Sequence, residues 1–169
     1  LAKIFLRGAQ AAKAEHHYKE VLRLYNEDES ARNTLITLYV KQKRYEDLTT
    51  FVKNWLEKAP DDPQRHYRLG IVYEFKKEYD LAVTEYKKAI ELQPGNAKML
   101  LALGRTYMKT GRISESRQAL EAASQADPAL AEPQLLLSSV KNSSQSLKKG
   151  VRKKNKKSGK KQVAPKKTT

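Results

Sequence analysis

Apolar and polar residues alternate along most of this chain with the spacing of amphipathic α-helices. In the segment 63–96, Leu69, Gly70 and Tyr73 share one helical face. After the polar stretch 76–78, a second apolar stripe follows at i, i+3, i+4 and i+7 spacing, which is typical of one buried helix face. This stripe comprises Tyr79, Ala82, Val83, Tyr86, Ala89 and Ile90. The segment therefore predicts two amphipathic helices joined by a short polar turn.

The same pattern recurs with a period of 34 residues. The series with this spacing are Leu1, Leu35, Leu69, Leu103 and Leu137, then Phe5, Tyr39, Tyr73 and Tyr107, then Pro60, Pro94 and Pro128. One helix pair cannot bury its apolar face alone, so successive pairs must stack. We expect Gly70 on the first helix and Ala82 on the second to let the helices of one pair cross closely.

Turn and capping residues mark the ends of these predicted helices. Gly111 stands at a position suited to a helix C-terminus. The segments 61–63 and 94–96 interrupt the chain between units, and the Asp or Asn residues in them are expected to cap the helix that follows. Asp61 and Asp62 are thus better explained as capping residues than as a cation site.

This pattern resembles the tetratricopeptide repeat family. The residues that match its signature best are Leu69-Gly70, Tyr73, Ala82, Tyr86, Ala89 and Pro94. The segment 97–130 matches through Leu103-Gly104, Tyr107, Ala123 and Pro128. In the segment 29–62, Leu48 and Trp55 stand where the family usually has Ala, so its two helices are expected to cross less closely. We expect Trp55 itself to belong to the core.

The resemblance implies an all-α fold, a right-handed α-solenoid of stacked helix-turn-helix repeats. It predicts a repeat domain over residues 1–147, with a partial repeat at 1–28, full repeats at 29–62, 63–96 and 97–130, and a polar capping helix at 131–147. The incomplete first repeat predicts that the chain is part of a longer array, and the polar last helix predicts a true end of the array. Residues 148–169 are predicted to form a disordered Lys-rich tail.

The family also implies a binding surface, because its first helices line a concave groove that holds a partner segment. The predicted groove residues are Asn33, Thr37, Gln64, Tyr67, Ile71, Glu74, Lys98, Leu101, Arg105 and Met108; Ser30 and Val40 occupy the two remaining positions of the first full repeat. Apolar members such as Tyr67 and Met108 would hold an anchor side chain. Lys98 and Arg105 would meet an acidic group. The groove lacks the Lys, Asn and Arg pattern with which some members clamp the C-terminal carboxylate of heat-shock chaperones, and Lys98 alone matches it.

Charge is concentrated at the C-terminal end of the chain. The 169 residues carry a formal net charge of +15, and residues 148–169 contain 11 Lys or Arg and no acidic residue. The residues expected to supply electrostatic attachment are Arg152, Lys153, Lys154, Lys156, Lys157, Lys160 and Lys161. Such a tail attracts nucleic acid or an anionic surface without reading sequence. Solubilisation alone is an equally simple interpretation of the tail.

Catalytic and metal-binding motifs are scarce. The chain has no Cys, which excludes disulfides and thiol chemistry. His16 and His17 are adjacent, so on a helix their side chains point in different directions and cannot easily bind one metal ion together. His66 falls at a position suited to core or edge packing. No apolar run reaches the length of a membrane span. We expect no catalytic residue, no metal and no cofactor, and a cytoplasmic location is favoured.

Three functions stay open at this point. The first is a non-catalytic scaffold or adaptor that binds a segment of a partner protein in the groove. The second is a nucleic-acid- or ribosome-associated protein bound mainly through its basic tail. The third is the repeat region of a larger enzyme or of a secretion or assembly factor. The sequence does not specify the oligomeric state.

Overall fold

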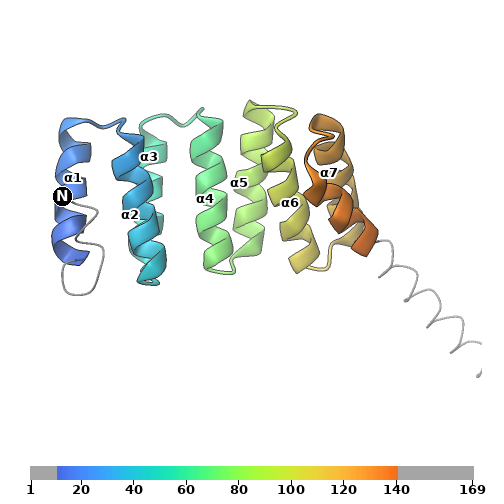
Figure 1. The fold of residues 1–169 in the computed structure, drawn as a ribbon, viewed down its shortest axis with the longest axis horizontal. Helices are drawn as coiled ribbons and strands as arrows, with labels where there is room; N and C mark the ends of the chain where they lie inside the picture. Colours follow the sequence, from blue (N-terminus) through green and yellow to red (C-terminus); the bar gives the residue numbers. More distant parts are fainter. Residues whose placement is uncertain (1–10, 141–169) are drawn as a thin grey trace, which may run out of the picture. The chain divides into compact units, whose positions relative to one another are not determined.

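The computed structural model describes residues 11–140, and every regular element in that range is an α-helix (Figure 1). The helices are α1 (Ala11–Leu24), α2 (Glu29–Lys41), α3 (Tyr45–Glu57), α4 (Pro63–Phe75), α5 (Tyr79–Leu92), α6 (Ala97–Lys109) and α7 (Ile113–Ala126). Residues 131–140 are helical as well. The all-α prediction with helix-turn-helix units is confirmed. The basic tail lies outside the described residues, and the division into repeats stays a prediction.

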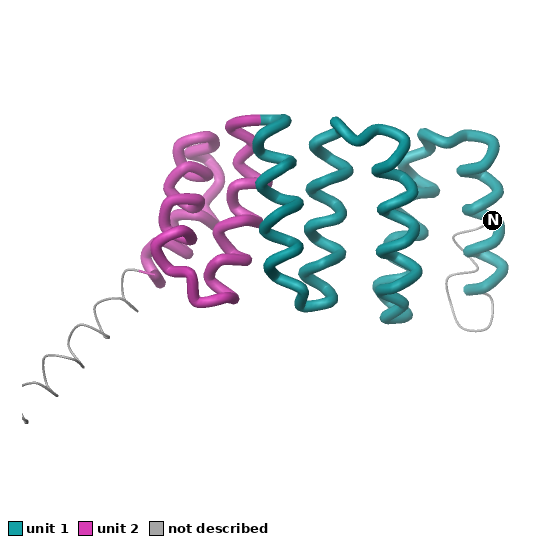
Figure 2. The backbone as a smooth tube through the Cα atoms, turned by 180° about the vertical axis from the view of Figure 1, so that it is seen from behind, with its two compact units in different colours: residues 1–93 teal, residues 94–169 magenta. Residues whose placement is uncertain are grey.

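The chain forms two compact units, which Figure 2 shows in different colours. The first spans residues 1–93 and contains α1 to α5. The second spans residues 94–169 and contains α6, α7 and the helical residues 131–140. Each unit is described by itself below.

Short polar side chains begin three of the helices. The Asp62 carboxylate accepts hydrogen bonds from the backbone N–H groups of Gln64 and Arg65, and Pro63 occupies the first turn of α4. Asp28 caps α2 and Asn96 caps α6 in the same way. Each cap satisfies backbone donors that the first turn of a helix leaves unpaired. The predicted capping by Asp62 and Asn96 is confirmed.

A residue in the left-handed conformation follows each of the helices α2, α4 and α6. Lys43, Lys77 and Gly111 are spaced by 34 residues and have φ angles of 57°, 62° and 73°. Glycine adopts this conformation without steric cost, as expected for Gly111. For lysine the same conformation is strained, because Cβ approaches the following carbonyl oxygen.

The core of the first unit is built from the residues that recur every 34 positions. Leu35, Tyr39 and Leu69 are at most 2% exposed, and Tyr73 is 7% exposed. Gly70 and Ala82 lie on two helices that contact each other extensively, and the Tyr86 ring lies closest to Gly70. A Cβ atom at Gly70 would lie 2.5 Å from Cε1 of Tyr86, so the missing side chain makes room for an aromatic ring.

The core of the second unit repeats this arrangement with smaller partners. A Cβ atom at Gly104 would lie 2.8 Å from the Leu120 side chain. The Ser116 hydroxyl donates a hydrogen bond of 2.8 Å to the Gly104 carbonyl oxygen. Leu120 packs further against Leu101 and Val140, so the helical residues 131–140 contribute to this core.

His66 belongs to the core of the first unit, as predicted. Its side chain is 9% exposed. Its Nδ1 lies 2.7 Å from a carboxylate oxygen of Glu85, and its Nε2 lies 2.8 Å from the carbonyl oxygen of Pro60. Both ring nitrogens are therefore occupied inside the protein.

Candidate functional site

On α2, the predicted groove residues Asn33 and Thr37 are exposed, one turn apart. The opposite side of the helix is buried through Leu35 and Leu38. The Thr37 hydroxyl donates to the Asn33 carbonyl oxygen at 2.8 Å. The Asn33 side-chain oxygen accepts a hydrogen bond of 2.9 Å from Arg68 of α4. This bond joins the open surfaces of α2 and α4 within the first unit.

On α4, the predicted residues form a partly apolar surface. Gln64 is exposed and donates to the side-chain oxygen of Gln93 at 3.2 Å. Tyr67, Ile71 and Glu74 are half-buried. The Tyr67 ring lies 5.7 Å from the Tyr86 ring, between centroids. Tyr67 and Ile71 are four residues apart, so they present neighbouring apolar groups on one helix face.

The α6 residues belong to the second unit and divide into accessible and buried members. Lys98 and Arg105 are exposed, and Arg105 forms an ion pair of 3.4 Å with Glu132. Met108 is half-buried and packs on the core. Leu101 is only 7% exposed and packs against the core, so its side chain offers nothing to a partner. The ten predicted residues therefore form one set in each unit.

Trp55 is half-buried rather than a core residue, which corrects the expectation from its position. The guanidinium carbons of Arg32, Arg65 and Arg68 lie 4.1, 4.8 and 5.7 Å from the centroid of its indole ring. Cations are attracted to the electron-rich face of an indole. We call Trp55 and these three residues the Trp55–arginine cluster.

Two members of the Trp55–arginine cluster are nearly inaccessible. The side chain of Arg32 is 3% exposed and that of Arg65 is 8% exposed. Arg32 donates to the Asn26 carbonyl oxygen at 2.6 Å, and Arg65 donates to the Trp55 carbonyl oxygen at 2.7 Å. Burial lowers the pKa of Arg32; Glu27 opposes this shift, and the neighbouring Arg65 and Arg68 add to it. The cluster thus concentrates positive charge in a poorly hydrated place.

A second charged network holds α1 on the first unit. The Glu15 carboxylate accepts a 3.0 Å hydrogen bond from the Tyr39 hydroxyl, forms a 2.8 Å ion pair with Lys19, and pairs with Arg44. Burial raises the pKa of Glu15, but the hydrogen bonds from Arg44, Lys19 and Tyr39 outweigh burial and lower it to about 2. Glu15 is therefore ionised throughout the physiological pH range.

The described residues offer no assembled metal centre and no membrane span. Within residues 11–140, no three His, Asp or Glu side chains are grouped so that they would hold a metal ion. No helix in the same range has both the length and the apolar character needed to cross a membrane.

Two family models, each described as a tetratricopeptide repeat, match this chain. One matches residues 46–97 and the other matches residues 76–140. Together they cover residues 46–140, which is more than half of the 169-residue chain.

Curated relatives share parts of this sequence. The BBSome complex member BBS4 of Bos taurus is 30% identical over 108 residues, which are 64% of this chain and 20% of that protein. The E3 SUMO-protein ligase RanBP2 of Homo sapiens is 28% identical over 72 residues, which are 43% of this chain and 2% of that protein. The chain therefore spans a fifth or less of the length of these relatives.

Solved structures share the fold at low sequence identity. The crystal structure of MamA is 19% identical with a TM-score of 0.67, and the match covers 89% of this chain and 92% of MamA. The first tetratricopeptide domain of Spaghetti (RPAP3), bound to the HSP90 peptide SRMEEVD, is 17% identical with a TM-score of 0.60, over 64% of this chain and 86% of that chain. With the 34-residue period and the helix pairs described above, the two family-model matches identify the chain as a tetratricopeptide repeat protein.

Proposed function

We propose that this protein is a non-catalytic scaffold that binds an extended segment of a partner protein on the open surfaces of its first-helix positions. In the first unit this surface comprises Asn33, Thr37, Gln64, Tyr67 and Ile71, with Glu74 beside them. The observation that carries the proposal is the hydrogen bond between Asn33 and Arg68, which joins the open faces of α2 and α4. Beside it, Tyr67 and Ile71 supply apolar area for an anchor side chain.

The comparisons support a protein as the partner. The RPAP3 domain was solved with a bound peptide, and BBS4 is a member of a protein complex. In the second unit, Lys98, Arg105 and Met108 would contribute contacts to an acidic or apolar part of the partner. Leu101 is left out of the proposed surface because it is buried.

A sharp test exploits two matched threonines. Thr37 and Thr84 are both exposed, and each donates its hydroxyl to the carbonyl oxygen four residues earlier, at 2.8 and 3.0 Å. Thr37→Arg places a long charged side chain on the proposed surface, whereas Thr84→Arg places the same side chain on α5. Partners are first identified by photo-crosslinking from residue 67, with residue 87 on α5 as the reference position.

We expect crosslinks at residue 67 that are absent at residue 87, and we expect Thr37→Arg to abolish them while Thr84→Arg leaves them intact. Thermal unfolding followed by circular dichroism should give the same midpoint for both variants. Equal crosslinking from residues 67 and 87, or equal loss in both Thr variants, would contradict the proposed surface.

The basic tail supports a second candidate function, attachment to nucleic acid or a ribosome. It rests on the run of 11 Lys or Arg without an acidic residue in 148–169. Replacing Arg152, Lys153, Lys154, Lys156 and Lys157 by Gln in the full chain would then abolish binding to a random RNA and its steep salt dependence. Unchanged RNA affinity, or affinity that does not fall with salt, would remove this candidate.

A further inference from the structure

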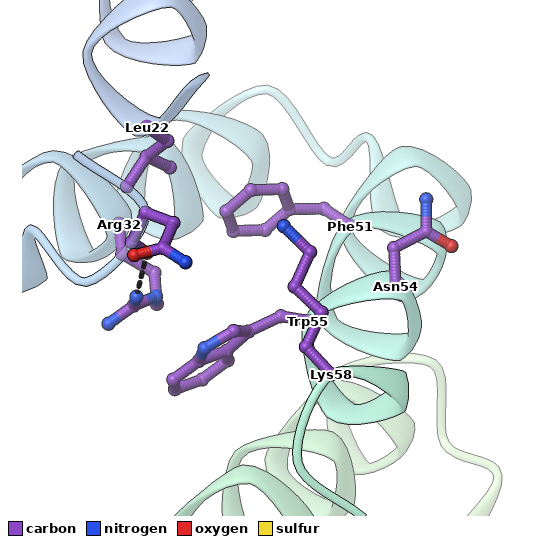
Figure 3. Close-up of a pocket in the computed structure, with 7 residues that line it drawn as sticks. Leu22, Arg32, Phe51, Asn54, Trp55 and Lys58 are labelled. Carbon is purple, nitrogen blue, oxygen red and sulfur yellow. Dashed lines mark hydrogen bonds between the residues drawn. The ribbon is translucent and has the colours of Figure 1, made fainter. Parts of the chain in front are cut away.

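A pocket of about 100 Å³ opens among the end of α1, the start of α2 and the second half of α3 (Figure 3). Its lining consists of Leu22, Asn26, Arg32, Phe51, Asn54, Trp55 and Lys58. None of these residues belongs to the predicted groove. We call this cavity the Trp55 pocket.

The polar groups in the Trp55 pocket are mainly hydrogen-bond donors. Lys58 contributes an ammonium, Arg32 a guanidinium, and Asn26 and Asn54 amide groups. The lining includes no carboxylate. Leu22 and Phe51 supply an apolar wall beside these donors, as Figure 3 shows. Such a lining favours a ligand that is anionic at one end and apolar beside it.

Trp55 itself contributes an unused donor. Its Nε1 is buried and has no hydrogen-bond partner among the described residues. Figure 3 shows this nitrogen on the edge of the ring that faces Arg32. A buried N–H without an acceptor is costly, and in native structures it is an exception that calls for an explanation. An acceptor atom on a bound ligand would provide the missing partner.

The charge balance around the pocket favours an anion. Among the residues that the structure describes, Glu27 and Asp62 form ion pairs with the arginines of the Trp55–arginine cluster. Glu27 lies 3.4 Å from both Arg32 and Arg65, and its side chain is 63% exposed, so this pairing is long and largely hydrated. Lys58 adds a further cation to the lining of the pocket. The site thus holds more positive than negative charge.

The segment between Leu22 and Asn26 exposes large apolar side chains. Leu24 is 64% exposed and Tyr25 is 68% exposed. Exposed aromatic residues beside a cationic pocket are typical of protein interfaces. A small free anion would leave this apolar surface uncovered, whereas a polypeptide segment would bury it.

We propose that the Trp55 pocket binds the side-chain carboxylate of a Glu in a partner protein segment, whose neighbouring apolar residue packs against Leu22 and Phe51. The carboxylate accepts hydrogen bonds from Trp55 Nε1 and from the Arg32 guanidinium, and it pairs with Lys58. The proposal rests on the proposed role as a protein-binding scaffold, but it uses a separate surface. Thr37→Arg should therefore leave binding at the Trp55 pocket unchanged.

The single Trp of the chain makes this site directly observable. In the ¹⁵N-labelled full-length protein, the indole N–H gives one resonance, which reports on Trp55 alone. The probe is the peptide acetyl-Gly-Ser-Leu-Glu-Ser-Gly-amide, compared with its Glu→Gln twin and with inorganic phosphate at equal ionic strength. We expect a saturable shift of the indole resonance with the Glu peptide and none with the Gln twin.

Three variants separate a binding role from a structural one. Lys58→Gln should weaken peptide binding by about fivefold, because one charged contact is lost. Glu27→Gln should strengthen it by about twofold, because the arginines lose their competing carboxylate. Lys87→Gln, an exposed lysine on α5, is the control and should change nothing. A purely structural role for Glu27 would not increase affinity.

The remaining outcomes overturn the proposal. They are an indole resonance that does not move, a shift that the Gln twin reproduces, or saturable binding of phosphate without binding of the Glu peptide. If the parent protein gives no specific crosslinks from residue 67 but still shows the indole shift, the proposed function is refuted and the pocket stays in place.

Discussion

The helix pairs α2–α3 and α4–α5 lie in the same unit and occupy the same repeat positions, yet they pack differently. α4 and α5 contact each other much more extensively than α2 and α3. Where α4 has Gly70, α2 has Ile36, and where α5 has Ala82, α3 has Leu48. The prediction that the 29–62 pair crosses less closely is therefore confirmed. The small residues Gly70 and Ala82 let α4 and α5 approach closely. The larger residues Ile36 and Leu48 keep α2 and α3 further apart.

The looser packing has chemical consequences. Phe51, Asn54 and Trp55 in the Trp55 pocket come from α3, and Lys58 follows directly after this helix. In α4–α5 the positions equivalent to Arg32 and Phe51 are occupied by His66 and Glu85, whose side chains are joined by a contact of 2.7 Å. The comparison teaches that a degenerate repeat loses apolar contact and gains a cavity with charged walls.

The largest expected effect is a loss of stability when a side chain is added at Gly70, in the closely packed α4–α5 pair. Gly70→Val places side-chain atoms where the Tyr86 ring lies, since a Cβ alone would approach that ring to 2.5 Å. We expect the free energy of unfolding to fall by about 3 kcal/mol, as overpacking of a close-packed core does. Urea denaturation followed by circular dichroism measures this change.

Ile36→Val is the matched control, because it places the same residue at the same repeat position of the loose pair. Ile36 is half-buried, and we expect a loss of only about 0.5 kcal/mol. Similar losses for both variants would mean that the two pairs do not differ in how closely they pack.

The repeat pattern allowed the fold to be predicted because the positions that it repeats are the buried ones. The pattern did not reveal the Trp55–arginine cluster, because a repeat signature records what the repeats share. The cluster is built from positions where one repeat differs from the others. Arg32 aligns with His66 and Leu100, and Arg65 aligns with Ala31 and Met99. The sequence did contain one signal for the cluster: Arg32 and Arg65 stand at positions that are apolar in another repeat.

The candidate surface shows the same limit at a single repeat position. Asn33, Tyr67 and Leu101 are equivalent by the 34-residue period, yet they are exposed, half-buried and buried in turn. Leu101 is buried because it packs into a cluster that includes Val140 of the last described helix. Burial at such a position depends on the neighbouring element, which the repeat signature of one helix does not encode.

An intermediate effect is expected at Glu15, which joins α1 to Tyr39 of α2 by a hydrogen bond and to Arg44 by an ion pair. Its side chain is 13% exposed, and its pKa is lowered from 4.5 to about 2. After allowance for screening of the half-exposed Arg44, Glu15→Gln should cost about 2 kcal/mol at pH 7. Because the folded pKa lies below the unfolded one, this stability is complete above pH 4.5 and disappears as the pH falls towards 2.

The measurement is the free energy of unfolding of both proteins between pH 7 and pH 2, with Glu20→Gln as the control. Glu20 is on the same helix, but it forms only a hydrated ion pair with Arg23, for which we expect at most about 0.5 kcal/mol. Curves for Glu15→Gln and the parent that stay parallel down to pH 2 would contradict this account.

The smallest effect tests whether the two pairs differ in their turns as well as in their packing. Lys43 follows α2 and Lys77 follows α4, both in the left-handed conformation that Gly111 adopts after α6. Replacing either lysine by Gly removes a strain of about 1–2 kcal/mol and adds a glycine entropy cost of about 0.5–1 kcal/mol. Each variant should therefore gain about 0.5 kcal/mol in the free energy of unfolding. Because the strain is local to the backbone, the gains should be equal in the loose and the tight pair. A gain in the free energy of unfolding at Lys77 without one at Lys43 would show that the turn of the loose α2–α3 pair is not strained. The difference between the two pairs would then extend to the backbone.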